Sequence, residues 1–343
     1  MISTKEILQT SREIHKQTLG PALVIAFFFK FLVGLSESLV SMLSGALTGE
    51  TLSGVGKWLK ELTAKEEVDR GQVLAGLDQH VPKLLLAWAV SIAIGWLIYS
   101  VFDALAKEGY FRWFSRNREL RVSEGFRPTP SRRLLFSFFK RENYAVTVKA
   151  CFYKNLRLWL WALPFYLLSL GVAYMNWRVV KQNLWLKHLL DSNPQEADIY
   201  YQTEWLDFGF WGFLLVTLFF LSIALYVSKR LSYSQADWFL ADNPHLGGQR
   251  ALELSEKLMQ GKKKVRLLLA FAYLPWFLLP MALAMVPTLM TLNAILLPLL
   301  YLFVDSRYHQ AQAEFYATVR DEAVEKGLIS MEELGYHRLP DSL

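Results

Sequence analysis

Two charged side chains, Lys30 and Glu37, interrupt an otherwise apolar stretch near the start of the sequence. Seven residues separate them, which places both on nearly the same side of a helix. A charge at membrane depth costs about 2.5–3.5 kcal/mol on insertion scales, and such residues often mark transport pathways or relays. Direct contact requires both long side chains to reach, so we expect each to have a partner elsewhere. The alternatives are buried structural ion pairs, or a first span that begins later in the chain.

Several acidic and histidine side chains are weaker candidates. Asp103 and Asp305 occupy matched positions at the ends of apolar segments, where a carboxylate commonly meets Arg or Lys. His309 follows Asp305 by one helical turn, but two ligands fall short of the three or four that a zinc site needs. The same holds for a second set, which comprises Asp237, Asp242 and His245. The stretch DNPHLGG that begins at Asp242 more simply ends one helix and opens the turn into the next.

Catalytic and cofactor motifs are missing from the sequence in any suitable context. The single cysteine, Cys151, excludes an intramolecular disulfide and a multi-cysteine metal site. We therefore expect no catalytic residue, no metal and no cofactor, and we interpret the chain as non-enzymatic.

The elements that must position these residues are apolar blocks. Hydrophobic residues make up 53% of the 343, and about 20 of them in succession cross a membrane as a helix. The last block, 267–304, is 38 residues without a charge. One helix of that length would span about 57 Å, so two crossings with a turn near Pro287 fit better. The sequence thus predicts an all-α integral membrane protein, a six-helix transmembrane bundle with spans at 21–47, 84–105, 156–175, 208–228, 267–286 and 288–304.

The positions of Lys and Arg predict the orientation of these spans. Four segments together contain 27 basic residues and are predicted to be cytoplasmic: 1–20, 106–155, 229–266 and 305–343. The loops 48–83 and 176–207 contain only 8 and are predicted to be extracellular, although each includes helix-like pieces. Both termini are then inside, and the net charge of +6 faces the inner leaflet. Nucleic acid is not an expected partner, because no nucleic-acid motif accompanies the charge.

The basic segments are predicted to contact anionic lipid at the inner face. Between Lys107 and Arg121, arginines alternate with aromatic residues, which is typical of an interfacial helix whose rings enter the headgroup region. The candidate side chains for binding lipid phosphate are Arg112, Arg116, Lys262, Lys263, Lys264 and Arg266.

Three helical hairpins are possible repeats of one unit. Their entries align at Ser11, Thr147 and Ser255. Their exits align at Tyr99, Tyr226 and Tyr301, each followed at twelve to fifteen residues by an aromatic pair: Trp113-Phe114, Trp238-Phe239 and Phe315-Tyr316. Chance similarity between apolar segments is the alternative explanation.

Four stretches resemble a known family. They are EILQTSREIHKQTLGPALVI near the start, YSQADWFLADNP, ALELSEKLMQGKKKVRLLL and the ending AEFY. Together they are similar to the integral membrane proteins grouped as domain of unknown function 975, multi-pass proteins of Gram-positive bacteria. The resemblance extends from Thr4 to Tyr316, is most specific over 233–264 and is poorest before the fourth span. It implies a helical protein of the bacterial plasma membrane and no particular activity.

Two classes of function remain open from the sequence. The first is a non-enzymatic membrane scaffold or regulator that engages lipid or another membrane protein. The second is a transporter of a small molecule or lipid, with a polar pocket around Lys30 and Glu37. A closed bundle favours the scaffold, whereas a polar cavity lined by both charges favours transport.

Overall fold

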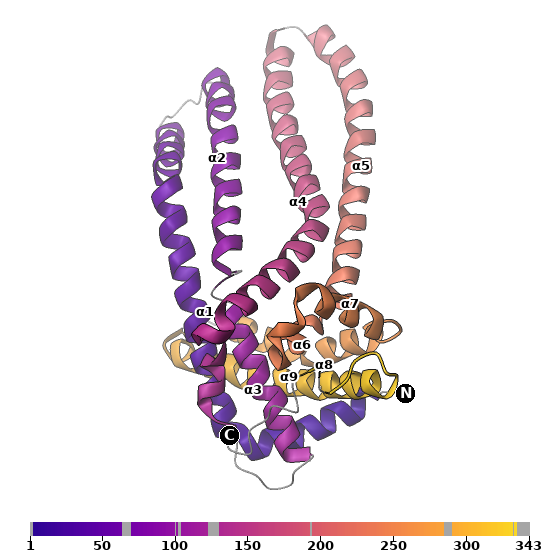
Figure 1. Cartoon of the computed structure of the whole chain (residues 1–343). Coiled ribbons are helices and arrows are strands. Elements are labelled where there is room, and N and C mark those ends of the chain that lie inside the picture. Colours follow the sequence, from indigo (N-terminus) through magenta and orange to yellow (C-terminus); the bar gives the residue numbers. More distant parts are fainter. Residues whose placement is uncertain are drawn as a thin grey trace. The chain divides into compact units, whose positions relative to one another are not determined.

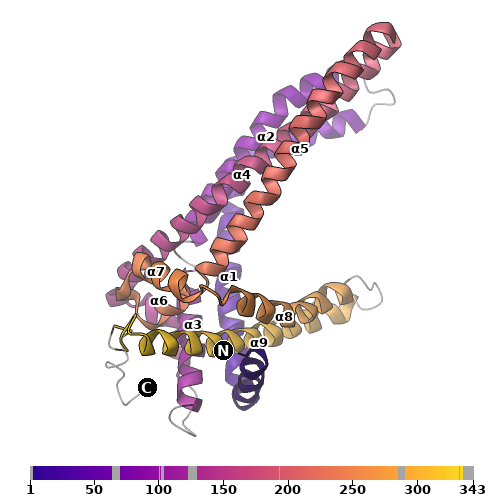
Figure 2. The ribbon, with the colours of Figure 1, turned by 90° about the vertical axis from the view of Figure 1, so that its right-hand side faces the viewer.

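The computed structural model describes residues 3–63, 70–99, 101, 104–122, 130–192, 194–284, 290–331 and 333–334. Regular structure within these ranges is helical throughout. In chain order the helices are α1 (Thr4–Thr63), α2 (Arg70–Ile98), α3 (Ala104–Val122), the 3-10 helix η2 (Arg132–Phe139), α4 (Arg141–Ser192), α5 (Pro194–Ser232), α6 (Ala236–Asp242), the 3-10 turn η3 (Pro244–Leu246), α7 (Gly248–Leu258), α8 (Lys263–Ala284) and α9 (Met290–Glu325). Figures 1 and 2 show α4 and α5 as a hairpin of two long helices.

Four helical stretches among the described residues are long and apolar enough to cross a membrane. They are Thr4–Trp58, Gln79–Ile98, Asn143–Asn176 and Gly209–Asp242. The expectation of an all-helical protein is therefore confirmed for the described residues, as is the expectation of several helices long and apolar enough to span a membrane. The fifth and sixth predicted spans overlap α8 and the first part of α9, which are not among these four stretches. The turn predicted near Pro287 lies outside the described residues.

The two segments predicted as loops between spans are largely continuous helix. Helix α1 extends to Thr63 and α2 begins at Arg70, while α4 extends to Ser192 and α5 begins at Pro194. The helical pieces expected in these segments are present, and the end expected for the piece over 177–190 at Ser192 is confirmed, but their separation from the spans was wrong. Hydrophobicity determines where a helix can cross a membrane, but backbone propensity determines where it ends, and Leu, Lys, Glu and Gln all favour helix. Proline at the first position of α5 agrees with its tolerance there.

From the sequence, Gly20-Pro21 is expected to break the first helix at the membrane, and the break occurs two residues earlier. Thr18 has non-helical angles (φ −120°, ψ 18°), and its hydroxyl donates to the Ile14 carbonyl at 2.9 Å. Proline within a helix conflicts with the carbonyl four residues before it, which explains a kink on the N-terminal side of Pro21. Before the kink, the sequence pattern places four residues on one side of the helix: Ile7, Leu8, Ile14 and Thr18. Three of them are buried, and Leu8 is half-buried.

The described chain divides into two compact units. The first unit comprises Met1–Ser36, Ile98–Arg157 and Ser228–Leu343, and the second comprises Glu37–Leu97 and Leu158–Val227. The second unit exposes many large apolar side chains, as lipid-facing helices do, whereas the first unit has an aromatic core. The largest fully buried rings of that core are Tyr110, Trp113, Phe114, Phe138, Trp238, Phe239, Phe315 and Tyr316.

The interfacial role predicted for the segment from Lys107 to Arg121 is wrong in one respect. Helix α3 packs its aromatic residues into the first unit's core instead of presenting them to headgroups. Phe111 stacks on Trp238 of α6 with ring centroids 4.4 Å apart. Alternating Arg and aromatic residues are compatible with both placements, because long polar side chains extend past a buried ring to the surface.

The predicted end of one helix and start of the next between residues 242 and 248 is confirmed. Asn243 accepts the His245 N–H at 3.0 Å, and Gly247 has a φ of +79°, which is accessible to glycine at no steric cost. A Cβ on Gly248 would lie 2.3 Å from the Ala150 carbonyl oxygen, so glycine there lets α7 approach α4 closely.

Candidate functional site

Lys30 and Asp305 form an ion pair between α1 and α9. The Lys30 ammonium lies 3.5 Å from Asp305 Oδ1, and Tyr110 of α3 donates its hydroxyl hydrogen to Asp305 Oδ2 at 2.8 Å. Three helices of the first unit therefore meet at one carboxylate. The contact supplies the partner predicted for Lys30 and the basic neighbour predicted for Asp305. Asp103, predicted at the matched position, lies outside the described residues.

His309 bonds to the backbone of Asp305 and adds no charge to the site. Its Nδ1 lies 2.9 Å from the Asp305 carbonyl oxygen, which can only accept, so Nδ1 is the protonated nitrogen. Burial lowers the pKa of His309, against the opposing effect of Asp305, so the ring is neutral at pH 7. In the part of the chain that the structure describes, no three His, Cys, Asp or Glu side chains gather as metal ligands.

A mainly apolar groove of about 580 Å³ opens beside this ion pair. Its lining residues include Lys30 and Asp305 and the apolar side chains Phe27, Phe31, Phe277, Pro298, Tyr301 and Leu302. The side chain of Lys30 is 48% exposed and that of Asp305 only 10%. The accessible charge in the groove is therefore the ammonium.

Glu37 does not join Lys30 at this site. It is exposed and is not one of the residues that line the groove. From the sequence, both side chains are expected to face the bundle interior; in the structure Lys30 is half exposed and reaches Asp305 with its long stem. The structure thus pairs Lys30 with a carboxylate 275 positions later, not with the one seven positions later.

A second cluster of charges is deeply buried in the first unit. Lys154 of α4 contacts Asp237 of α6 and lies 3.7 Å from Glu108 Oε1 of α3. Lys107 donates to the other oxygen of Asp237 at 2.8 Å. Cys151 donates its thiol hydrogen to Glu108 Oε1 at 3.5 Å. The sequence analysis missed this cluster, and its only signal was charge in two segments that also supply buried rings.

The environment of Glu108 favours its neutral form. Burial raises the pKa of this carboxyl to about 7, while Lys154 and Lys107 oppose the shift. A buried charge is costly unless it is paired and hydrogen-bonded, and Lys154 shares its single positive charge between Glu108 and Asp237. The cluster joins α3, α4 and α6, and its composition suits a structural role.

Other polar side chains in the first unit's core bond to one another. Asn117 donates to the Thr18 hydroxyl at 3.1 Å and to Gln310 Oε1 at 3.0 Å, which connects α3 with α1 and α9. Tyr316 donates to Asp242 Oδ2 at 2.5 Å. These contacts connect the helices within the protein, although Asn117 Oδ1 and Gln310 Nε2 are buried without a hydrogen-bond partner among the described residues.

The candidates for binding lipid phosphate differ in their availability. Arg116 is buried, and the Arg112 guanidinium lies 5.3 Å from the centre of the Phe138 ring. Lys262 pairs with Glu322 at 2.5 Å, and Arg266 donates to the Tyr308 hydroxyl at 3.1 Å. The two remaining candidates are more accessible: Lys263, which donates to the Ser228 hydroxyl at 3.2 Å, and Lys264, which is exposed.

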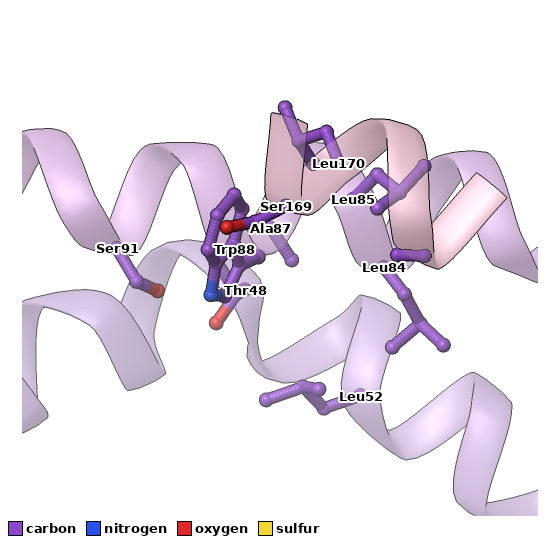
Figure 3. Close-up of a pocket in the computed structure, with 10 residues that line it drawn as sticks. Thr48, Leu52, Leu84, Leu85, Ala87, Trp88, Ser91, Ser169 and Leu170 are labelled. Atoms are coloured by element: carbon purple, nitrogen blue, oxygen red, sulfur yellow. The ribbon is translucent and has the colours of Figure 1, made fainter. Parts of the chain in front are cut away.

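The second unit contains a cavity of about 540 Å³ between α1, α2 and α4 (Figure 3). Leu52, Leu84 and Trp88 are among its lining residues. Of its polar lining groups, Thr48 donates to the Ser44 carbonyl and Ser169 to the Phe165 carbonyl, both at 2.7 Å. These hydroxyls are bonded within their own helices, so the cavity suits an apolar occupant.

Comparison with known proteins found no matching family model, no curated protein and no solved structure.

Proposed function

We propose that this chain is a non-enzymatic scaffold or regulator of the bacterial plasma membrane that engages lipid or another membrane protein. It crosses the membrane six times as three helical hairpins, with both termini in the cytoplasm. The basic segments lie at the inner face and bind anionic lipid there, with Lys263 and Lys264 as the contacts to phosphate. The four candidate spans and the 27 to 8 distribution of basic residues support this arrangement.

Burial at matched positions supports the three-hairpin repeat. The entry residues Ser11, Thr147 and Ser255 are all fully buried in the first unit. The three aromatic pairs that follow the exits are buried there as well. A repeated hairpin that packs its exit helix into a common core accounts for both observations.

One observation supports a scaffold above all others: many buried polar side chains of the first unit bond to one another, although Glu108 Oε2 and Gln235 Oε1 have no hydrogen-bond partner among the described residues. Asn117, Asp242, Glu108 and Lys154 all have partners within the protein. The cavity beside Lys30 and the cavity in the second unit are mainly apolar. Such surfaces suit acyl chains and packed helices better than a hydrophilic solute.

Transport is the second candidate, because an ion pair does line one groove. A translocated polar solute needs several convergent polar groups, and this groove offers Lys30 and Asp305 among mostly apolar side chains. Glu37, the other charge on which the transport hypothesis depends, is not among its lining residues. We therefore rank transport below lipid engagement.

The test of the proposal is lipid retention by the whole chain. Protein purified in mild detergent is incubated with mixed phosphatidylglycerol and phosphatidylcholine, separated from free lipid and analysed by native mass spectrometry. We expect selective retention of phosphatidylglycerol, reduced in the double variant Lys263→Gln/Lys264→Gln. Each basic residue near the surface contributes about 1 kcal/mol, so the loss is on the order of tenfold or more and diminishes with added salt.

The matched control is Lys57→Gln, which removes an exposed lysine from a segment predicted to be extracellular. This variant should retain phosphatidylglycerol like the unchanged protein. Equal retention of both lipids by the unchanged protein would contradict the proposal. Uptake of a solute by proteoliposomes, abolished by Lys30→Met, would favour transport instead.

A further inference from the structure

The half-exposed ammonium of Lys30 is an anomaly in its surroundings. The nearest lining rings, Phe27 and Phe31, are themselves 55% and 56% exposed, as lipid-facing side chains are. Lys30 lies among them on a helix long and apolar enough to cross a membrane. A charge in hydrocarbon is costly unless a polar group meets it. Asp305 meets the ammonium at 3.5 Å and the centre of the Phe29 ring lies 5.7 Å from it, while the Lys30 side chain is 48% exposed and lines the groove.

We infer that this groove holds one phospholipid, with its phosphate on the Lys30 ammonium and an acyl chain along Phe27, Phe31, Phe277 and Leu302. This inference rests on the proposed function, because it specifies which class of lipid binds and where it binds. At about 580 Å³ the groove lies within the range of small-molecule sites, roughly 300–1,000 Å³.

Charge and exposure select a phosphate-bearing lipid. Asp305 is 10% exposed and already accepts from Tyr110, so the carboxylate is turned into the protein while the ammonium faces the groove. A phosphate oxygen accepts strong charge-assisted bonds from an ammonium. An uncharged lipid would leave the exposed part of the ammonium unpaired.

Titration of the full chain with two lipids of equal acyl chains tests the inference. Detergent-purified protein, freed of native lipid, is titrated with phosphatidylglycerol and separately with diacylglycerol, and native mass spectrometry reports each bound species. The variants are Lys30→Met, Lys30→Arg and the control Lys57→Met. Because Lys30→Met strands the Asp305 carboxylate, the double variant Lys30→Met/Asp305→Asn tests the site in a chain without that unpaired charge.

We expect the tightest phosphatidylglycerol to bind roughly five- to tenfold more weakly to Lys30→Met and to the double variant, and to bind normally to Lys30→Arg and Lys57→Met. Diacylglycerol should bind weakly to every variant. Unchanged phosphatidylglycerol affinity in both Lys30→Met variants would overturn the groove site while leaving lipid engagement intact. Diacylglycerol binding as tight as phosphatidylglycerol would also overturn it. Failure of the unchanged protein to bind phosphatidylglycerol would overturn the proposed function itself.

Discussion

At the scale of single residues, the first unit buries charges that must be satisfied by one another. Glu108 and Lys154 are almost completely enclosed, and Asp237 is shared between two lysines. Removing one partner of such a group leaves the other charge uncompensated, which is more costly than removing both. The titration of Glu108 is therefore a direct probe of the core.

Glu108→Gln should change how stability depends on pH. The folded pKa of Glu108 is raised from 4.5 to about 7, so its contribution is fully present below pH 4.5 and is lost as pH rises towards 7. Between pH 4.5 and pH 7, the unchanged protein should lose about 3 kcal/mol of its free energy of unfolding relative to the variant. Chemical unfolding in detergent at a series of pH values measures the difference.

The control for this experiment is Glu322→Gln. Hydrogen bonds from Lys262 and Lys326 lower the pKa of Glu322, so its contribution is present above pH 4.5 and is lost as pH falls. Relative to the unchanged protein, the free energy of unfolding of Glu322→Gln should therefore fall as pH rises, whereas that of Glu108→Gln rises. If the free energy of unfolding changed with pH in the same way for Glu108→Gln and the unchanged protein from pH 4.5 to 7, burial of an ionisable Glu108 would be contradicted.

Tyr316→Phe should destabilise the first unit, because Tyr316 donates a 2.5 Å bond to the buried carboxylate of Asp242. Hydrogen bonds to charged groups contribute about 1.5–3 kcal/mol, and we expect a loss of that size in the free energy of unfolding. Tyr144→Phe changes an exposed tyrosine and should have an effect within about 0.5 kcal/mol. Equal effects of the two substitutions would contradict the contact.

At the scale of elements, close approach between helices depends on small residues. A Cβ on Gly109 of α3 would lie 2.0 Å from the Leu135 carbonyl oxygen of η2. Gly109→Ala should therefore separate the two elements and cost about 1–3 kcal/mol or more. Gly45→Ala is the matched control, because no atom lies within 4 Å and alanine favours helix by roughly 1 kcal/mol. Stabilisation by both substitutions in thermal unfolding would refute the packing of α3 on η2.

The sequence predicted elements better than it predicted their ends and neighbours. Apolar blocks and proline positions were enough to expect the helices and the break before Pro21, because both signals are local. A helix end near Ser192 was expected, but the continuity of that helix with the third span was missed, since hydropathy does not report helix propensity. The pairing of Lys30 with Asp305 was missed because it depends on how helices pack, and sequence spacing contains no information on distant contacts.

At the scale of the whole molecule, the proposed engagement of lipid at the inner face depends on which side of the membrane each segment occupies. Three positions identify the sides: Ser53 and Ser192, in segments predicted to be extracellular, and Gln249, in a segment predicted to be cytoplasmic. Ser53 and Gln249 are exposed in the structure, so a cysteine at either position is accessible to a reagent. Ser192 is the last residue of α4.

Single-cysteine labelling in a Cys151→Ser background is the measurement that tests this account most directly. With a membrane-impermeant maleimide on intact cells, Ser53→Cys and Ser192→Cys should be labelled, and Gln249→Cys only after permeabilisation. That pattern is the one expected if the basic segments face the cytoplasm and the inner leaflet. Labelling of Gln249→Cys in intact cells, with Ser53→Cys and Ser192→Cys unlabelled until permeabilisation, would invert the topology and contradict the proposed engagement of lipid at the inner face.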